Sequence, residues 1–323
     1  MKGVKIVGIG HYCPSNIVSN EYISSLIDTS DEWIVKRTGI RERRISNGET
    51  TVDLAVKASE EALKNSGYTP EDIDLIIVAT TSPDRIVPST ACSVQERLGC
   101  INATAFDILA ACSGFVYGLI VANSLLKTNE KFRALVIGSE VLSRIVDWKD
   151  RSTCILFGDG AGSAVLESSE DCGIISTFFG SDGIKGIKAL TSTNFSLNNP
   201  FVESNEEKRY IEMDGRELFK FAVSIIPDIV NNLLEKSNEN IENIKYIIPH
   251  QANSRIIDEA SKRLGISSDK FYMNLDKYGN TSSASIPIAL DEMIKDELIK
   301  KGDKVILAAF GGGLTWAGAL IEI

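Results

Sequence analysis

The sequence predicts a layered α/β fold made of two similar halves, and three observations carry that prediction. Segments with strand patterns and segments with helix patterns alternate along the 323 residues. Several strand segments are continuous apolar runs, which is typical of parallel strands buried on both faces of a sheet. Patterns of the first half then recur in the second half, which indicates an internal duplication.

The first half supplies its elements in a regular order. Apolar runs predict strands over residues 4–9, 73–79, 106–109 and 134–137. Apolar residues at helical spacing predict helices over 51–65, 91–98 and 114–126. Residues 154–157 and 164–167 are then expected to pair as two strands around a glycine turn.

The second half echoes the first in three places. ALKNSG at 62–67 with EDIDLII at 71–77 recurs as LLEKSN at 233–238 with ENIKYII at 242–248, RLG at 97–99 recurs at 263–265, and FGDG at 157–160 recurs as FGGG at 310–313. We therefore assign the halves to residues 1–170 and 171–323. On this register the turn at Cys112 falls opposite the turn at Gly279 and Asn280, so a site between the halves would draw residues from both.

The composition excludes several classes of function. A net charge of -10, with 43% hydrophobic and 24% charged residues, argues against nucleic acid as the main partner. No apolar run reaches the roughly 20 residues of a membrane span, and the N-terminus lacks a signal-peptide pattern, so we expect a cytoplasmic protein. With two histidines, a zinc site is not expected. Six cysteines are scattered without C-x-x-C pairs, as expected of free thiols: Cys13, Cys92, Cys100, Cys112, Cys154 and Cys172.

Cys112 is the candidate nucleophile. It lies between an apolar strand and an apolar helix, where unpaired N–H groups and the helix dipole favour an anion, so we expect a lowered pKa. The alternative is a buried structural cysteine. Its candidate partners in the second half are His250, directly after the strand at 246–248, and Asn280, directly before a helix. A lone histidine after a strand is more often structural, but the three residues together suggest covalent thiol chemistry.

Two basic clusters stand out in this acidic chain. The first has four guanidiniums within eight residues, preceded by Trp33, and suits phosphates: Arg37, Arg41, Arg43 and Arg44. The alternative for this cluster is a solvated charged face next to Asp28, Asp31 and Glu32. The second cluster comprises Lys220, Arg255, Lys262 and Arg263. The glycine-rich stretches lack the third glycine of a dinucleotide fingerprint and the lysine of a P-loop, so a nucleotide cofactor is not indicated.

Five motifs carry a resemblance to a known family: DILAACSGF, LFGDGAG, HQAN, GNTSSAS and AFGGGLTW, in this order. They resemble the β-ketoacyl-acyl-carrier-protein synthase III family of the thiolase superfamily, and the likeness runs nearly end to end. The resemblance implies a fold of five layers in which helices and sheets alternate. It implies condensation of a short acyl-CoA primer with malonyl-acyl-carrier-protein, which releases CoA and carbon dioxide and begins a fatty acid. The alternatives are a related synthase with another acyl or aryl primer, and a non-enzymatic carrier-binding module, which would not need all three candidate residues.

The resemblance also implies roles for single residues. Cys112 would hold the acyl group, and the backbone N–H groups of Cys112 and Gly312 would stabilise its oxyanion. Nε2 of His250 and the side-chain amide of Asn280 would stabilise the enolate left by decarboxylation, and no metal or redox cofactor is implied. The positions similar to those that bind CoA are Trp33, Arg37, Arg151, Gly215, Phe219, Ala252 and Asn253. The positions similar to the docking surface for acyl carrier protein are Lys220, Arg255, Lys262 and Arg263.

The segment RIVPS at 85–89 resembles the loop that reaches across a homodimer interface in this family and caps the acyl pocket of the partner. Val87 would be the cap. Since several members carry phenylalanine there, the resemblance implies a homodimer with room for primers larger than acetyl; the alternative is an ordinary apolar turn residue. Two features depart from the family pattern, namely the polar stretch at 191–209 and Arg216.

Overall fold

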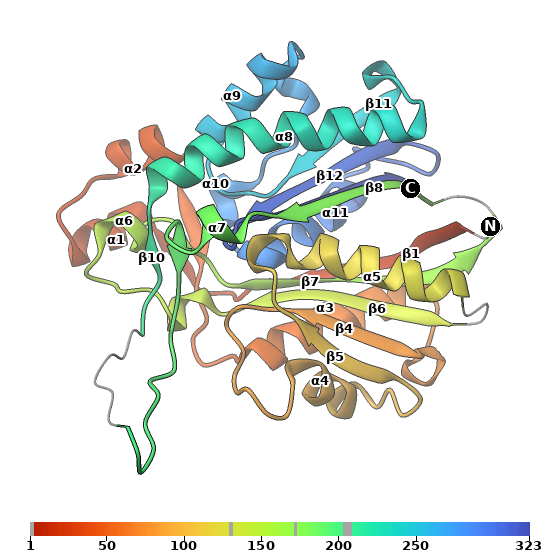
Figure 1. Ribbon diagram of the computed structural model, residues 1–323, viewed down its shortest axis with the longest axis horizontal. Helices are drawn as coiled ribbons and strands as arrows, with labels where there is room; N and C mark the ends of the chain where they lie inside the picture. The colour runs from red at the N-terminus through yellow and green to blue at the C-terminus, as the bar shows by residue number, and fades with distance from the viewer. Residues whose placement is uncertain (1–2, 129–131, 171–172, 203–208) are drawn as a thin grey trace.

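Two stacked β-sheets and three helical layers make up the molecule (Figure 1). The computed structural model describes residues 3–128, 132–170, 173–202 and 209–323. Helices lie outside each sheet and between the two sheets, so the order of layers is α, β, α, β, α. The expected five-layer arrangement is confirmed.

The first sheet has the strand order β1, β7, β6, β4, β5. Its strands are β1 (Gly3–Tyr12), β4 (Leu75–Ala79), β5 (Thr104–Ile108), β6 (Arg133–Glu140) and β7 (Gly160–Ser169). β4 is parallel to β5 and β6, while β7 is antiparallel to β1 and β6. The outer helices α3 (Thr51–Ser66) and α4 (Thr90–Leu98) cover this sheet. Helix α3 begins at a capping box of Thr50 and Asp53 and ends at Gly67 in the left-handed conformation.

The second sheet repeats this arrangement with the order β11, β12, β13, β8. Its strands are β8 (Ile174–Ser181), β11 (Ile244–Pro249), β12 (Lys304–Gly311) and β13 (Thr315–Glu322). As in the first sheet, the last strand lies antiparallel between the first strand and a parallel pair. Helices α8 (Gly215–Ser237) and α9 (Ser254–Leu264) cover its outer side. The helix, turn and strand echo seen in the sequence is therefore a structural repeat.

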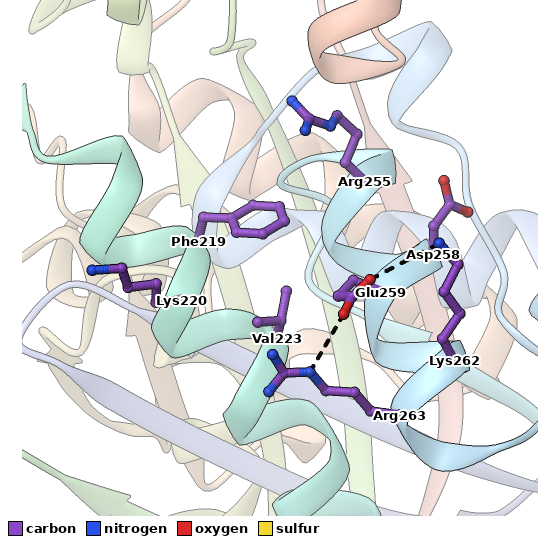
Figure 2. A pocket seen from close by; sticks show the side chains of 8 residues that line it. All are labelled: Phe219, Lys220, Val223, Arg255, Asp258, Glu259, Lys262 and Arg263. Atoms are coloured by element: carbon purple, nitrogen blue, oxygen red, sulfur yellow. Dashed lines mark ion pairs between the residues drawn. The ribbon is translucent and has the colours of Figure 1, made fainter.

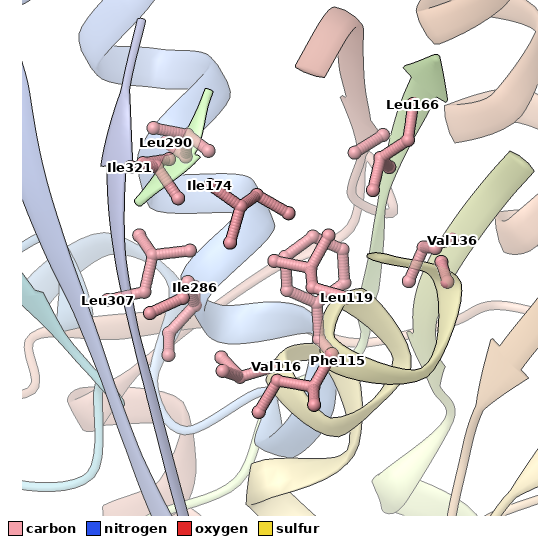
Figure 3. Packing of buried hydrophobic residues seen from close by; sticks show 14 of the residues in the cluster. Phe115, Val116, Leu119, Val136, Leu166, Ile174, Ile286, Leu290, Leu307 and Ile321 are labelled. Atoms are coloured by element: carbon pink, nitrogen blue, oxygen red, sulfur yellow. The ribbon is translucent and has the colours of Figure 1, made fainter. Parts of the chain in front are cut away.

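The middle layer consists of α5 (Gly114–Thr128) and α11 (Ser285–Lys295). Phe115 and Leu119 of α5 meet Ile286 and Leu290 of α11 in the core between the sheets, and Leu307 of β12 belongs to the same cluster (Figure 3). All five side chains are essentially inaccessible. Removing a buried phenylalanine ring costs about 3–5 kcal/mol, so this layer contributes strongly to the stability that holds the two halves together.

One expected element is wrong. Residues 154–157 do not form a strand: α6 (Arg151–Cys154) ends there, begun by Asp150, whose carboxylate accepts a hydrogen bond from the backbone N–H of Ser152. The strand begins later, at Gly160, inside the glycine segment. Gly162 is required because a Cβ there would lie 2.6 Å from Cβ of Pro287 in α11. The other expected strands and helices of the first half are confirmed within a few residues.

Shorter elements connect the layers and carry part of the site. They are β2 (Ile17–Ser19), α1 (Asn20–Leu26), α2 (Asp31–Thr38), β3 (Glu42–Arg44), α7 (Gly183–Gly186), β9 (Leu190–Thr191), β10 (Glu212–Met213) and α10 (Leu275–Tyr278). The 3-10 turns are η1 (Pro70–Asp72), η2 (Ala111–Ser113), η3 (Leu142–Arg144), η4 (Ile241–Asn243), η5 (Ser268–Lys270) and η6 (Ser282–Ala284). Most of the polar stretch at 191–209 joins β9 to β10, and its residues 203–208 lie outside the described part. None of the described helices has the length and apolar character to cross a bilayer.

Candidate active site

Cys112 lies in η2, between the end of β5 and the start of α5. The preceding Ala111 has φ 47°, which is rare for a residue with a side chain and marks a strained turn. Gly114 begins α5 close against β4, since a Cβ there would lie 2.8 Å from Cβ of Ala79. The sharp turn presents the half-buried Cys112 at the end of a helix that is buried between the sheets.

The glycine turn after β12 closes over the cysteine. A Cβ on Gly311 would lie 2.8 Å from the backbone nitrogen of Cys112, so a larger residue cannot occupy this position. Oγ1 of Thr315 lies 3.0 Å from the carbonyl oxygens of both Ala110 and Gly312, and it therefore links the cysteine turn to the glycine turn. The structure thus brings Gly312 to the turn of Cys112, as the sequence predicts. The role of Thr315 was not predicted.

Asn280 reaches the same place from the second half. Gly279, with φ 65°, makes the turn that leads into it, and η6 directly after Asn280 packs against η2. The backbone N–H of Asn280 donates to Leu156 O at 2.8 Å, and the backbone oxygen of Asn280 accepts from Gly158 N at 3.0 Å. Its side-chain oxygen accepts from the N–H of Ser282 at 2.9 Å, which leaves the amide NH₂ as the available donor. The expected meeting of the two turns is confirmed.

His250 follows β11 and is almost completely buried, with 2% of its surface exposed. Its backbone N–H donates to Ala308 O of β12 at 2.9 Å, and its ring lies edge-on against Phe310, with 5.2 Å between the ring centroids. Burial lowers the pKa of His250 to about 3, so the imidazole is neutral at physiological pH. Nδ1 of the ring lies 2.8 Å from Oγ of Ser285, the first residue of α11.

The expected lowering of the Cys112 pKa is wrong. Burial raises the pKa of the Cys112 thiol to about 12; a hydrogen bond with Ser282 opposes that rise, and the negative charge of Glu140 adds to it. A helix N-terminus is worth about 0.3–1 kcal/mol at the surface, less than one pKa unit, whereas loss of hydration can shift a pKa by up to about 3–5 units. Desolvation therefore outweighs the dipole, and the resting thiol is neutral.

Glu140 is a buried carboxylate that the sequence reasoning missed. It is fully inaccessible at the end of β6, where its oxygens accept hydrogen bonds from Oγ of Ser82 at 2.6 Å, from Thr81 N at 3.0 Å and from Oγ of Ser283 at 2.9 Å. Burial raises its pKa despite these donors. Because Ser283 belongs to η6, Glu140 fixes the turn after Asn280 to the first sheet. The signal in the sequence was an acidic residue that continues an apolar strand.

Three residues expected to bind CoA form one cluster. The guanidinium carbons of Arg37 and Arg151 lie 5.6 Å and 4.9 Å from the centroid of the Trp33 ring. The side-chain amide of Asn253 donates to the backbone oxygen of Arg37 at 3.0 Å, which joins this cluster to the start of α9. An indole flanked by two guanidiniums is suited to a heteroaromatic ring that carries phosphates.

A groove of about 440 Å³ lies between α8 and α9 (Figure 2). Phe219 and Arg255 lie at one end, with the guanidinium carbon 5.9 Å from the centroid of the ring. The groove is lined by four cations and two carboxylates, namely Lys220, Arg255, Lys262, Arg263, Asp258 and Glu259, together with Phe219 and Val223. The docking positions predicted from the sequence therefore share one surface with Phe219. Gly215 lies one turn before Phe219 on α8, and Ala252 lies just before α9.

The arginine cluster at 37–44 divides in the structure. Arg37 and Arg41 are exposed, whereas Arg43 is completely buried and Arg44 pairs with Glu42 at 2.9 Å between Nη1 and Oε1. The prediction that all four guanidiniums suit phosphates is therefore wrong for Arg43, because no ligand can reach it.

Val87, the predicted cap of the acyl pocket, is 82% exposed.

Among the described residues, one group of side chains could hold a metal ion: His11, Glu61 and Asp291. Nδ1 of His11 contacts a carboxylate oxygen of Asp291, and the ammonium of Lys295 lies 2.6 Å from Glu61 and 2.7 Å from Asp291. The lysine already supplies the cation that these carboxylates need.

The five cysteines within the described residues are free, and Cys172 lies outside them.

Comparison with known proteins agrees with this geometry. Two family models match, described as 3-oxoacyl-[acyl-carrier-protein] synthase III over residues 106–183 and as the C-terminal part of the same protein over residues 234–323. A beta-ketoacyl-[acyl-carrier-protein] synthase III of Clostridium beijerinckii is 54% identical over 323 residues, which is 100% of both chains. One of Clostridium botulinum is 53% identical over 323 residues, which is 99% of each chain.

A solved structure gives the same result for the fold. The crystal structure of 3-oxoacyl-[acyl-carrier-protein] synthase III from Aquifex aeolicus VF5 matches with a TM-score of 0.91 at 46% identity, over 99% of this chain and 100% of that chain. The layers and the cysteine turn define a condensing acyltransferase of the thiolase-like class. Within this class, the chain belongs to the β-ketoacyl-acyl-carrier-protein synthase III family.

Proposed function

We propose that the protein condenses a short acyl-CoA primer with malonyl-acyl-carrier-protein in a decarboxylating Claisen reaction, the first condensation of fatty-acid synthesis. The observation that carries this proposal is the meeting of the Cys112 turn with the Asn280 turn at the interface of the two halves. The neutral His250 contacts Ser285, which follows η6, and Phe310, which precedes the glycine turn. The names of the matching family and of the relatives support the proposal, since they describe the synthesis of a 3-oxoacyl group on acyl carrier protein.

The first half-reaction transfers the acyl group to Cys112. The sulfur attacks the thioester carbonyl, a new C–S bond forms, the C–S bond to CoA breaks, and the thiol proton ends on CoA. The backbone N–H groups of Cys112 and Gly312 stabilise the tetrahedral oxyanion, a type of contact worth about 3–4 kcal/mol for each donor. The close approach of Gly311 to the Cys112 nitrogen supports this assignment.

The second half-reaction uses the other pair of donors. Nε2 of His250 and the amide of Asn280 hold the thioester oxygen of malonyl-acyl-carrier-protein while its terminal C–C bond breaks and carbon dioxide leaves. The resulting enolate carbon attacks the acyl-cysteine, a C–C bond forms, and the C–S bond to Cys112 breaks. The sulfur leaves as a thiolate, which takes a proton from water. Two neutral donors suit this step, since they stabilise negative charge without transferring a proton to the enolate. We propose that these steps need no metal or redox cofactor.

Binding of the two substrates is assigned to neighbouring surfaces. The cluster of Trp33, Arg37 and Arg151 takes the adenine and phosphates of CoA, and the pantetheine passes Gly215, Phe219, Ala252 and Asn253. The groove of Figure 2 takes the acidic carrier protein, because four cations outnumber two carboxylates there. Only local charge matters at a range of about one Debye length, so an acidic enzyme can attract an acidic partner.

We further propose a cytoplasmic homodimer in which Val87 caps the acyl pocket of the partner. Ile86 and Val87 are 65% and 82% exposed, and Leu109, just beyond the edge strand β5, is 78% exposed. Large apolar side chains that are exposed favour cover by another chain.

The test is to incubate the protein with acetyl-CoA or another acyl-CoA and to measure the mass of the peptide that contains Cys112. The proposal expects an added acyl group on that peptide, then its transfer to a β-ketoacyl product when malonyl-acyl-carrier-protein is added. Cys112→Ser should accumulate no thioester. The absence of an adduct with every primer of a panel would contradict the proposed function.

A further inference from the structure

Arg43 is a charged side chain that the proposed reaction does not use, and it is completely buried. Burial lowers its pKa to about 10, so the guanidinium keeps its charge at neutral pH. Among the described residues, no carboxylate forms an ion pair with it, and its Nε atom has no hydrogen-bond partner. A buried cation without a counter-ion opposes folding unless hydrogen bonds offset its loss of hydration.

One end of the guanidinium holds the segment that pairs with Asn280. Nη2 of Arg43 donates to the backbone oxygen of Ile155 at 2.7 Å. The next carbonyl, that of Leu156, accepts the N–H of Asn280 at 2.8 Å, and Gly158 donates to the backbone oxygen of Asn280 at 3.0 Å. Arg43 therefore lies one peptide away from the backbone contacts that place Asn280.

The stem of the same side chain packs beneath the turn. A Cβ on Gly158 or on Gly279 would lie 3.2 Å from Cβ of Arg43, so both glycines rest directly on the arginine. Neither position has room for a side chain: a Cβ on Gly158 would also lie 2.2 Å from the backbone oxygen of Tyr278, and one on Gly279 would lie 2.8 Å from that of Leu156. The conformation of the residue before Asn280 is thus fixed between Arg43 and the segment at 155–158.

The other end of the guanidinium is tied to β2 and to the first residue of α1. Nη1 donates to Oδ1 of Asn20 at 2.9 Å and to the backbone oxygen of Val18 at 3.2 Å. The amide NH₂ of Asn20 in turn lies 2.8 Å from both Oδ1 of Asp31 and the backbone oxygen of Ile40. Asp31 begins α2, the helix that carries Trp33.

We propose that Arg43 is a positioning residue for Asn280, which sets the place of the Asn280 amide in the enolate site. The proposal rests on the proposed function and deepens it. A phosphate-binding role is excluded by the complete burial of the side chain. Since the hydrogen bonds of Arg43 among the described residues go to Val18, Asn20 and Ile155, loss of the guanidinium affects decarboxylation and leaves acylation of Cys112 largely intact.

The test compares Arg43→Met, which removes the charge and the fork, with Arg43→Lys, which keeps one ammonium. Arg97→Met is the control for the same substitution, because Arg97 is exposed on α4 and has no part in the proposed reaction. The rates of acyl addition to Cys112 and of carbon dioxide release from malonyl-acyl-carrier-protein are measured together with the melting temperature. We expect release to fall at least tenfold in Arg43→Met and less in Arg43→Lys, acylation to stay within threefold, and Arg97→Met to match the wild type.

An equal fall of both rates in folded Arg43 variants would overturn the proposal. Should Arg43→Met fail to fold, Arg43→Lys and Asn20→Ala decide, since Asn20→Ala removes one acceptor and should lower carbon dioxide release selectively. Equal rates of release in these two variants and the wild type would also overturn it. The wild-type protein distinguishes failure of the proposed function from failure of the role of Arg43. If the wild type shows neither acylation nor carbon dioxide release, the proposed function is contradicted. If the wild type shows both and the variants lose neither selectively, only the role of Arg43 is contradicted.

Discussion

Nδ1 of His250 lies 2.8 Å from Oγ of Ser285, and the same Oγ lies 3.4 Å from the backbone nitrogen of Gln251. The Ser285 oxygen accepts the Gln251 N–H, so its own proton is free to be donated to Nδ1. A neutral imidazole that accepts at Nδ1 carries its proton on Nε2. The relationship therefore selects the tautomer in which Nε2 is a donor, the form that stabilisation of an enolate requires.

Ser285→Ala removes the group that selects this tautomer. We expect the rate of malonyl decarboxylation to fall about tenfold, since a hydrogen bond is worth about 1–1.5 kcal/mol and tenfold corresponds to 1.4 kcal/mol. Acylation of Cys112 should be unchanged. Release of labelled carbon dioxide measures the first effect and peptide mass the second. Ser283→Ala, on the same segment but bonded to Glu140, is the comparison variant.

His250→Ala and Asn280→Ala should separate the two half-reactions more strongly. Each removes one donor to the thioester oxygen of malonyl, and such a loss costs about 3–4 kcal/mol, or 10²–10³ in rate. Acyl addition to Cys112 should be largely spared, because its oxyanion is assigned to backbone N–H groups. Single-turnover acylation and carbon dioxide release are measured on the same preparations. Equal losses in both steps would show that the division of roles is wrong.

The pH dependence of Cys112 follows from its burial. Because burial raises the pKa of this thiol to about 12, the thiolate fraction in the unliganded protein should rise about tenfold for each pH unit between 7 and 10. Alkylation by iodoacetamide should rise in parallel, when followed by the mass of the Cys112 peptide. Alkylation of the exposed Cys92 is measured separately, on the peptide that contains it. A plateau below pH 8 would instead support the lowered pKa that the helix position alone suggests.

The fold was largely predictable because its signals are local. Apolar runs and helical spacing identified the strands and helices, and the echo of 62–77 in 233–248 identified the duplication. The strand predicted over residues 154–157 is wrong, since an apolar run does not show whether a neighbouring strand is available to pair with it. In the structure Ile155 and Phe157 are buried in an apolar cluster with residues of β2, α1 and α2. The backbone of Ile155 is held by Arg43 instead of a neighbouring strand.

The site residues that belong to sequence motifs were predictable. Those that act through contacts with residues far away in the sequence were not. Cys112, His250 and Asn280 lie at element ends that a motif identifies. Ser285 acts on a residue 35 positions away, and Arg43 acts on a carbonyl 112 positions away, so no local pattern announces them. The predicted direction of the Cys112 pKa shift was wrong for a similar reason, because the burial of this thiol depends on the packing of the second half.

Arg255 is the candidate for the main electrostatic contact with the carrier protein. Lys262 and Arg263 lie 3.9 Å and 3.7 Å from Glu259, and Lys220 lies 2.6 Å from Glu217, whereas no ion pair of Arg255 is seen among the described residues (Figure 2). An exposed cation without a counter-ion retains its full charge for a partner.

Arg255→Glu should therefore raise the KM for malonyl-acyl-carrier-protein about tenfold at low salt, with a smaller effect at high salt. The KM for acyl-CoA should change little. Lys262→Glu is the matched control, because it makes the same change of charge at a cation that Glu259 already neutralises in part, and its effect should be smaller. Steady-state kinetics at two salt concentrations distinguish the variants. A parallel rise of both KM values in Arg255→Glu would indicate damage to the tunnel or fold.

Val87 bears on the size of the primer. Its side chain is 82% exposed in the single chain, next to Ile86 at 65%, so it is free to enter the pocket of a second copy. If an isopropyl group caps the pocket where several family members have a phenyl ring, space remains for additional methylenes, each worth about 0.8 kcal/mol when buried.

We expect the protein to be a homodimer that accepts butyryl-CoA and branched four- to five-carbon primers, and Val87→Phe to shift its preference toward acetyl-CoA. One lost methylene contact corresponds to about fourfold in kcat/KM and two to about fifteenfold, since 1.4 kcal/mol is a factor of ten. The measurement is kcat/KM for acetyl-, butyryl- and isobutyryl-CoA in the wild type and the variant, with sedimentation to establish the dimer. Val87→Ile, which adds one methylene without a ring, serves as the control and should shift the ratio less. An unchanged ratio in Val87→Phe would remove Val87 from the acyl pocket, because a ring placed against the primer has to exclude the longer chains first.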